Sequence, residues 1–139
     1  MHSVTLAARI GFWLSFAAIT LLSLLPLQAL IALLFLLPVQ YAVQSTFSDK
    51  IEHFFAYMVL TAAGRIGYRD WPAPLTLAAA LIAYGIAIEV IQSFIPERMM
   101  SGWDVFANTA GVLVGLGISW MILRRLPSRP TQQLSQSRN

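Results

Sequence analysis

The residues best suited to chemistry form small polar groups within a strongly apolar sequence. The first group lies in residues 48–57, where Asp49, His53 and Tyr57 are spaced i, i+4 and i+8 and Lys50 follows Asp49 directly. On a helix this spacing places the three side chains on one stripe, with Lys50 beside it. Because a carboxylate can orient a histidine that acts as general acid or base, the stripe predicts acid–base chemistry or binding of a polar group.

Two later segments carry the remaining polar residues of this kind. Glu89 and Gln92 are spaced i, i+3 near the end of an apolar run, and Arg98 follows in a short polar connection. Asp104 and Asn108 are spaced i, i+4 at the start of the next apolar run. A charged side chain within the hydrocarbon costs roughly 2.5–3.5 kcal/mol on insertion scales, so such groups normally pair inside a bundle. We therefore expect the three segments to form one polar cluster.

The composition predicts a membrane protein. Of the 139 residues, 58% are hydrophobic and 11% charged, and the mean hydropathy is +0.69. A water-soluble domain with this composition would lack polar surface. The net charge of +3 does not indicate nucleic acid as a partner, because eight of the nine basic residues are arginines and most flank apolar runs. The absence of cysteine excludes disulfides, thiolate metal sites and thiol nucleophiles.

The predicted fold is an all-α integral membrane bundle of four transmembrane helices. Each span needs about 20 apolar residues, so four spans and short connections use most of the chain. Prolines and candidate helix caps place the spans at about residues 10–27, 48 to 64–68, 75–95 and 101–123. Together they form one transmembrane domain over residues 1–127, followed by a disordered cytoplasmic tail over residues 128–139.

The segment 28–44 has two interpretations. We expect a helical or re-entrant connection in or near the membrane interface. The alternative is a fifth span, because residues 29–37 are all apolar, although this run is shorter than a comfortable span.

The orientation is predicted from the positive charges of the short loops, which are retained on the cytoplasmic side. With four spans, one side holds seven basic residues and the other holds only Lys50 and Arg98. The seven are Arg9, Arg65, Arg69, Arg124, Arg125, Arg129 and Arg138. We therefore expect a multi-pass protein of the cell membrane with both termini in the cytoplasm and the polar cluster on the extracytoplasmic side. A fifth span would change the side of Arg9 alone.

Each polar residue also has a structural explanation. Asp49 and Asp104 can cap helices, and Lys50, Glu52 and Arg98 can reach the headgroup layer. The other residues can stabilise the packing of the bundle. Glu89 can pair with His53 or Arg98, and His53 and Tyr57 can be core side chains. Gln92 and Asn108 can form hydrogen bonds between helices, and Gly111 and Gly115 can form a small-xxx-small face.

At these positions the sequence resembles the VanZ-like family of small bacterial membrane proteins. The resemblance rests on Ser-Asp-Lys…His…Tyr at 48–57, Glu-x-x-Gln at 89–92, Pro-x-Arg at 96–98 with Ser101, and Asp-x-x-x-Asn-x-x-Gly-x-x-x-Gly at 104–115. It covers residues 48–117 and the earlier Leu24-Leu25-Pro26, and the long apolar segment before Ser48 departs from the pattern. The family takes its name from a protein linked to teicoplanin resistance. The resemblance implies a role in the cell envelope, whereas resistance itself is not carried over.

The main functional hypothesis is a site for an anionic amphiphile, such as a lipid-linked envelope precursor, reached from the outer leaflet. Its phosphate or carboxylate would contact Lys50 and Arg98. The further predicted binding residues are Gln92, Asn108 and Tyr57. An enzyme acting on such a substrate is the alternative, with His53 as general acid or base, Asp49 or Asp104 orienting it, and Glu89 as a second carboxylate.

The sequence also allows three other interpretations of the polar cluster. The polar cluster can be purely structural, locking the bundle without turnover. A divalent ion held by Asp49, His53, Glu89 and Asp104 is a variant of the site, although the sequence has no metal signature and we assign neither metal nor cofactor. An ion or proton pathway is disfavoured because the helices are apolar below the cluster. Membrane lipids are the expected partners, and the sequence defines no oligomeric state.

Overall fold

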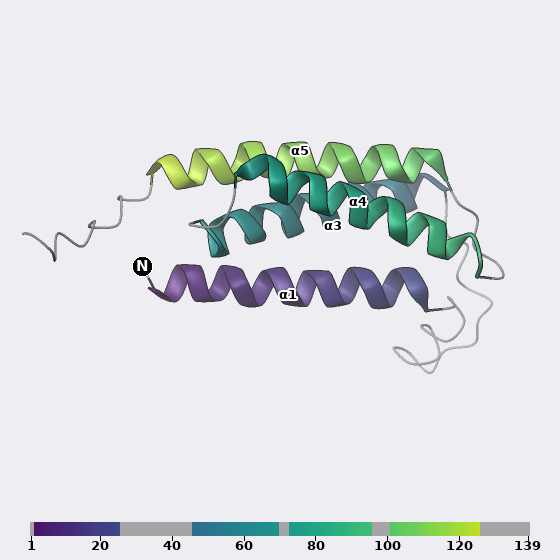
Figure 1. Ribbon diagram of the computed structural model, residues 1–139, viewed down its shortest axis with the longest axis horizontal. Helices are drawn as coiled ribbons and strands as arrows, with labels where there is room; N and C mark the ends of the chain where they lie inside the picture. The colour runs from purple at the N-terminus through teal and green to yellow at the C-terminus, as the bar shows by residue number, and fades with distance from the viewer. Residues whose placement is uncertain (1, 26–45, 70–72, 96–100, 126–139) are drawn as a thin grey trace, which may run out of the picture.

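The computed structural model describes residues 2–25, 46–69, 73–95 and 101–125. These residues form four α-helices and contain no strand, as Figure 1 shows. The helices are α1 (His2–Leu24), α3 (Thr46–Gly67), α4 (Pro74–Gln92) and α5 (Gly102–Arg125). The predicted all-α bundle is therefore confirmed.

The helices lie side by side, and each runs antiparallel to the one before it in this order (Figure 1). Consequently α3 and α5 run in the same direction, and they make the most extensive contact in the bundle. Helix α3 also contacts α1 and α4. The end of α1, the start of α3, the end of α4 and the start of α5 thus meet at one end of the bundle.

The described helices have the lengths and surfaces of a membrane protein. By length and composition, α1, α4 and α5 can each cross a membrane. Helix α3 has 22 residues and also carries several charged side chains. One of them, Lys50, forms an ion pair with the neighbouring helix α5. Large apolar side chains stay exposed on the outside of the bundle, among them Leu14, Phe94, Trp103, Phe106 and Leu113. Such a surface suits lipid as the surrounding solvent.

Several helix boundaries differ from the predicted ones by two residues or more. Helix α1 begins at His2 rather than near residue 10, and Arg9, which is exposed on α1, donates a hydrogen bond to the carbonyl oxygen of Gly67 at the end of α3. Helix α4 ends at Gln92 rather than at Ile95, because the last N–H groups before Pro96 bond to carbonyls three residues back. Helix α5 continues to Arg125. The segment 28–44 and the tail 128–139 lie outside the described residues.

The contact between α3 and α5 depends on two glycines. A Cβ atom on Gly111 would collide with the carbonyl oxygen of Phe54, and one on Gly115 would meet the carbonyl oxygen of Met58. The two backbones therefore touch directly, as a small-xxx-small face allows. Beside this contact, Val112 and Leu60 are completely buried in the core. The predicted packing role of the two glycines is confirmed.

The two ends of the bundle carry opposite charges. The acidic end is the one where α3 and α5 begin, and it holds Asp49, Lys50, Glu89 and Asp104. The arginine end is the opposite one, and its described basic residues are Arg9, Arg65, Arg69, Arg124 and Arg125.

Candidate functional site

The site is built first on the parallel pair α3 and α5. Asp49, Lys50 and His53 lie in the first two turns of α3, and Asp104 and Asn108 lie in the first two turns of α5. Because the helices run in the same direction and touch through their glycines, these two sets of side chains face each other at the same depth. Asp104 and Asn108 are 5% and 2% exposed, so the α5 half is buried.

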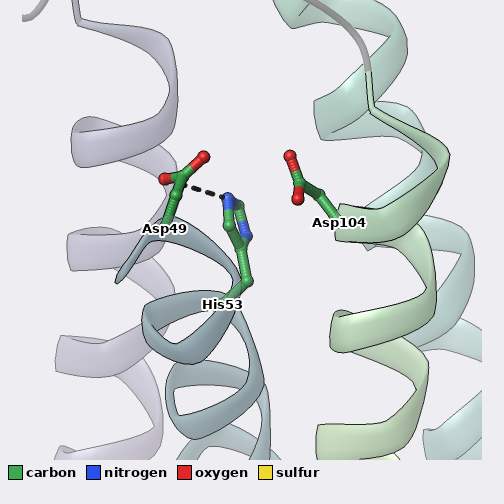
Figure 2. A group of neighbouring side chains, drawn as sticks. All are labelled: Asp49, His53 and Asp104. Atoms are coloured by element: carbon green, nitrogen blue, oxygen red, sulfur yellow. Dashed lines mark ion pairs between the residues drawn. The ribbon is translucent and has the colours of Figure 1, made fainter. Parts of the chain in front are cut away.

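Two close contacts join the two helices, and a third contact within α3 places the histidine beside a carboxylate. The Lys50 Nζ atom lies 3.2 Å from Asp104 Oδ1 and forms an ion pair. The Nδ1 atom of His53 lies 3.1 Å from Asn108 Oδ1, whereas its Nε2 atom lies 3.9 Å from Asp49 Oδ1. In Figure 2 the imidazole stands between the carboxylates of Asp49 and Asp104.

The hydrogen bond to Asn108 determines which nitrogen of His53 carries the proton. An amide oxygen can only accept, so Nδ1 is the donor in this contact. In a neutral imidazole Nε2 then holds a lone pair, and this lone pair is directed toward the carboxylates. That nitrogen is free to take a proton or to bind a metal ion.

Helix α4 adds Glu89, whose side chain is fully buried. Its Oε2 atom accepts a hydrogen bond from the backbone N–H of Ser101 at 3.2 Å. Asp104, a candidate cap predicted for the start of α5, pairs with Lys50 instead. Glu89 also interacts electrostatically with Asp104, His53 and Asp49. All three helices therefore contribute acidic groups to one cluster.

Tyr57 extends the polar cluster one turn deeper into the bundle. It is 1% exposed and interacts electrostatically with Glu89. A Cβ atom on Gly85 of α4 would lie 3.2 Å from the Tyr57 hydroxyl and 3.2 Å from Asn108 Nδ2. The missing side chain at Gly85 therefore leaves room for both polar groups against the α4 backbone.

Several buried polar atoms of this cluster have no partner. Within the described residues, Tyr57 OH, Glu89 Oε1 and Asn108 Nδ2 are inaccessible and make no hydrogen bond. A buried polar atom left without a partner costs about 1–3 kcal/mol, and native proteins contain few. Three such atoms in one cluster indicate that this part of the bundle is not arranged for stability alone.

Other predicted site residues are placed differently. The Nε2 atom of Gln92 donates to the carbonyl oxygen of Ser23 at 3.0 Å, which ties α4 to the end of α1. This contact favours the packing explanation for Gln92. Arg98 lies outside the described residues, and Glu52, which was expected to reach the headgroup layer and not to belong to the site, is exposed on α3.

The sequence reasoning missed two members of the site. The backbone N–H of Ser101 is a partner of Glu89, and Gly85 makes the space beside Tyr57 and Asn108. Gly85 precedes Glu89 by four residues and so lies on the same face of α4, which was the available signal. No sequence pattern predicts the contact between Ser101 and Glu89, because it depends on how the start of α5 packs against α4.

One group of side chains could hold a metal ion. Asp49, His53 and Asp104 each offer a ligand atom, and these atoms lie within 4.8 Å of one another (Figure 2). Glu89, which the sequence had suggested as a fourth ligand, does not belong to this group of three.

These features define a class of protein: a small helical membrane protein with a polar cluster buried at one end of its bundle. Within that class, the VanZ/LLP1 family model matches residues 3–124. The chain belongs to the VanZ/LLP1 family, as the motifs in the sequence suggested. Searches of curated proteins and of solved structures found no match.

Proposed function

We propose that the acidic end binds the headgroup of an amphiphilic molecule of the bacterial cell envelope, such as a lipid-linked precursor. The observation that carries this proposal is the set of three unpartnered buried atoms, Tyr57 OH, Glu89 Oε1 and Asn108 Nδ2. Tyr57 OH and Asn108 Nδ2 can donate hydrogen bonds to hydroxyl, carbonyl or phosphate oxygens of a ligand, whereas an ionised Glu89 Oε1 can only accept. A purely structural cluster would be expected to satisfy its own polar atoms.

The apolar surroundings favour a ligand that is itself part lipid. Leu, Phe and Trp side chains remain exposed around the helices next to the cluster, including Phe94, Trp103 and Phe106. An amphiphile can keep its chains against this surface in the bilayer while its headgroup enters the polar cluster. A soluble ligand would gain nothing from these side chains.

The charge distribution supports an extracytoplasmic position for the site. The arginines gather at the opposite end of the described bundle, and positive flanks are retained in the cytoplasm. The protein has no cysteine, so single cysteines can report this orientation. In intact cells, a membrane-impermeant maleimide should label Phe94→Cys at the acidic end and leave Ser3→Cys unlabelled until the membrane is opened. The reverse pattern would contradict the proposed orientation.

Headgroup binding can be tested with a defined probe. Purified protein in lipid nanodiscs would be titrated with a polyprenyl phosphate, with phosphatidylglycerol as the competing anionic lipid, and bound lipid measured by native mass spectrometry. We expect Tyr57→Phe, which removes a buried hydroxyl donor, to weaken binding, while the exposed control Glu52→Gln leaves it unchanged. Equal binding by both variants and the parent protein would refute a shared site.

A catalytic role is the second candidate, and the free Nε2 lone pair of His53 favours it. If the ligand carries a phosphoanhydride, Nε2 can take a proton from water as the water oxygen bonds to phosphorus. The P–O bond to the leaving phosphate then breaks, and the proton passes to that phosphate. Phosphate release from a polyprenyl diphosphate should occur with the parent protein and cease in His53→Ala. No release from the parent protein would remove this candidate and leave binding intact.

A further inference from the structure

The described acidic end has too little positive charge to hold an anionic group by itself. Asp49, Glu89 and Asp104 stand against one ammonium, that of Lys50, and this ammonium already pairs with Asp104 at 3.2 Å. Two negative charges that face each other in a low-dielectric interior repel strongly unless a cation lies between them. The cluster thus favours a cation before it favours an anion.

The imidazole of His53 is prepared for such a cation. Its Nδ1–H donates to the Asn108 oxygen, which fixes the ring and directs the Nε2 lone pair toward Asp49 and Asp104. This is the arrangement of metal-binding histidines, whose second nitrogen normally donates to an oxygen acceptor. Without a metal ion or a second proton on the ring, the Nε2 lone pair and Asp49 Oδ1 are two acceptors facing each other at 3.9 Å.

The spacing of the three side chains suits one ion. Metal–ligand bonds of about 2.1 Å allow two ligand atoms on the same ion to lie as far apart as about 4.2 Å. The gap of 3.9 Å between His53 Nε2 and Asp49 Oδ1 falls within this limit. All three ligand atoms lie within 4.8 Å of one another. Side-chain movements of about 1 Å would therefore bring the three atoms within bonding distance of one ion.

An independent observation at the same place points to a ligand. Glu89 is completely buried and interacts electrostatically with Asp49, His53 and Asp104, yet its Oε1 atom has no hydrogen-bond partner among the described residues. An ionised carboxylate needs a donor or cation at this atom, and a protonated one needs an acceptor. A water molecule bound to the ion would supply a donor.

We propose that Asp49, His53 and Asp104 bind a divalent transition-metal ion, with Glu89 accepting a hydrogen bond from a water molecule on that ion. One imidazole nitrogen and two carboxylate oxygens suit Zn²⁺ or Mn²⁺ better than Mg²⁺ or Ca²⁺, which prefer oxygen ligands alone. If the headgroup site proposed above is also correct, the ion provides the positive charge for a phosphate; this second step rests on the proposed function.

The metal site can be tested without any lipid ligand. Protein carrying no histidine tag would be stripped with a chelator and titrated with Zn²⁺, Mn²⁺ and Mg²⁺, and bound metal counted by mass spectrometry. We expect one Zn²⁺ or Mn²⁺ per chain, and at least a tenfold weaker affinity in His53→Ala and in Asp49→Asn. Asp49 is partly exposed, so its amide variant should fold even if the histidine variant does not.

The chain contains a matched control, because its other histidine is His2. His2→Ala should keep full metal binding. Lys50→Gln removes the cation that competes for Asp104 and should raise the metal affinity several-fold. No bound metal in the parent protein, or metal retained by His53→Ala and lost in His2→Ala, would overturn the proposal.

A lipid titration with and without the ion separates this proposal from the proposed function. Metal binding without any binding of polyprenyl phosphate would leave the metal site standing and refute the headgroup site. Lipid binding that is equal with and without a bound ion would refute the bridging step alone.

Discussion

At the arginine end of the bundle, Arg9 and the aromatic residues beside it have partners within the described residues. The Nε atom of Arg9 in α1 donates to the carbonyl oxygen of Gly67 at the end of α3, at 2.8 Å. The guanidinium also lies 5.0 Å from the ring centroid of Tyr68, and the Tyr68 hydroxyl accepts a hydrogen bond from Trp13. A positive group beside the carbonyl end of a helix is favoured by the helix dipole.

At the acidic end, the same kinds of groups are buried more deeply and paired less completely. Lys50 and Asp104 form an ion pair, and His53 bonds to Asn108. Atoms of Tyr57, Glu89 and Asn108 nevertheless have no hydrogen-bond partner in the described part of the bundle. One end thus contributes paired polar groups, whereas the other leaves buried polar atoms unpaired at a cost in stability, a pattern that functional sites commonly show.

The contact between the glycines of α5 and the backbone of α3 supports both ends, and breaking it should have the largest effect. Gly111→Leu would force a side chain into the carbonyl oxygen of Phe54. We expect the variant to yield no folded protein in detergent, measured by size-exclusion chromatography. Gly117→Leu is the control, because a Cβ atom at Gly117 meets nothing within 4 Å. Equal yields of the two variants would show that α3 and α5 need no close approach.

The arginine end is predicted to lose stability without losing function. Arg9→Ala removes a charged hydrogen bond and a cation–π contact, together worth about 2 kcal/mol of unfolding free energy. Unfolding in mixed micelles, followed by tryptophan fluorescence, would measure the loss. The exposed Arg125→Ala should change it by less than about 0.5 kcal/mol. If folded Arg9→Ala bound the headgroup more weakly than the parent protein, the arginine end would contribute to binding as well as to stability.

The acidic end is predicted to show the opposite behaviour with Glu89→Gln. Glutamine can still accept the Ser101 hydrogen bond, so the free energy of unfolding should stay equal or rise. Because neutral glutamine is a weaker acceptor for the water on the ion proposed above, binding of polyprenyl phosphate in the presence of that ion should weaken about tenfold, which corresponds to about 1.4 kcal/mol. Unfolding and native mass spectrometry on the same preparation would compare the two quantities. A drop in stability with unchanged binding would make the carboxylate a structural group.

The smallest expected effect concerns a single atom, the hydroxyl oxygen of Tyr57. Tyr57→Phe removes a buried hydroxyl that has no partner among the described residues, so the unfolding free energy should stay equal or rise by up to about 1 kcal/mol. Headgroup binding should fall about threefold. Tyr68→Phe is the matched control at the arginine end, where the lost hydroxyl does have a partner and stability should fall. If both variants lose stability equally, the Tyr57 hydroxyl has a structural partner.

Much of the fold could be predicted from the sequence because hydropathy and proline positions are local signals. The span of α4 after Pro72 and Pro74 and the glycine face of α5 both follow from such signals. The beginning of α1 did not, since Arg9 reads as a membrane boundary unless its partner on α3 is known. A local pattern cannot show that a distant helix provides a carbonyl oxygen at the right depth.

The composition of the candidate site was predictable to a similar degree. The i, i+4 spacings placed Asp49 with His53 and Asp104 with Asn108, and these four residues do lie together in the structure. The pairing of Lys50 with Asp104 and of Glu89 with Ser101 depends on the relative heights of three helices. Loop lengths and glycine contacts determine those heights, and a single sequence does not display them.

The parallel pairing of α3 and α5 has a consequence for how the protein is made. Helix α3 enters the bilayer before α5 has been synthesised, and until then Asp49, Lys50 and His53 have none of the partners that α5 supplies. A nascent chain at this stage must expose charged groups to lipid or remain associated with the insertion machinery. Chains that stop after α4 are therefore expected to be degraded by membrane proteases faster than the full chain.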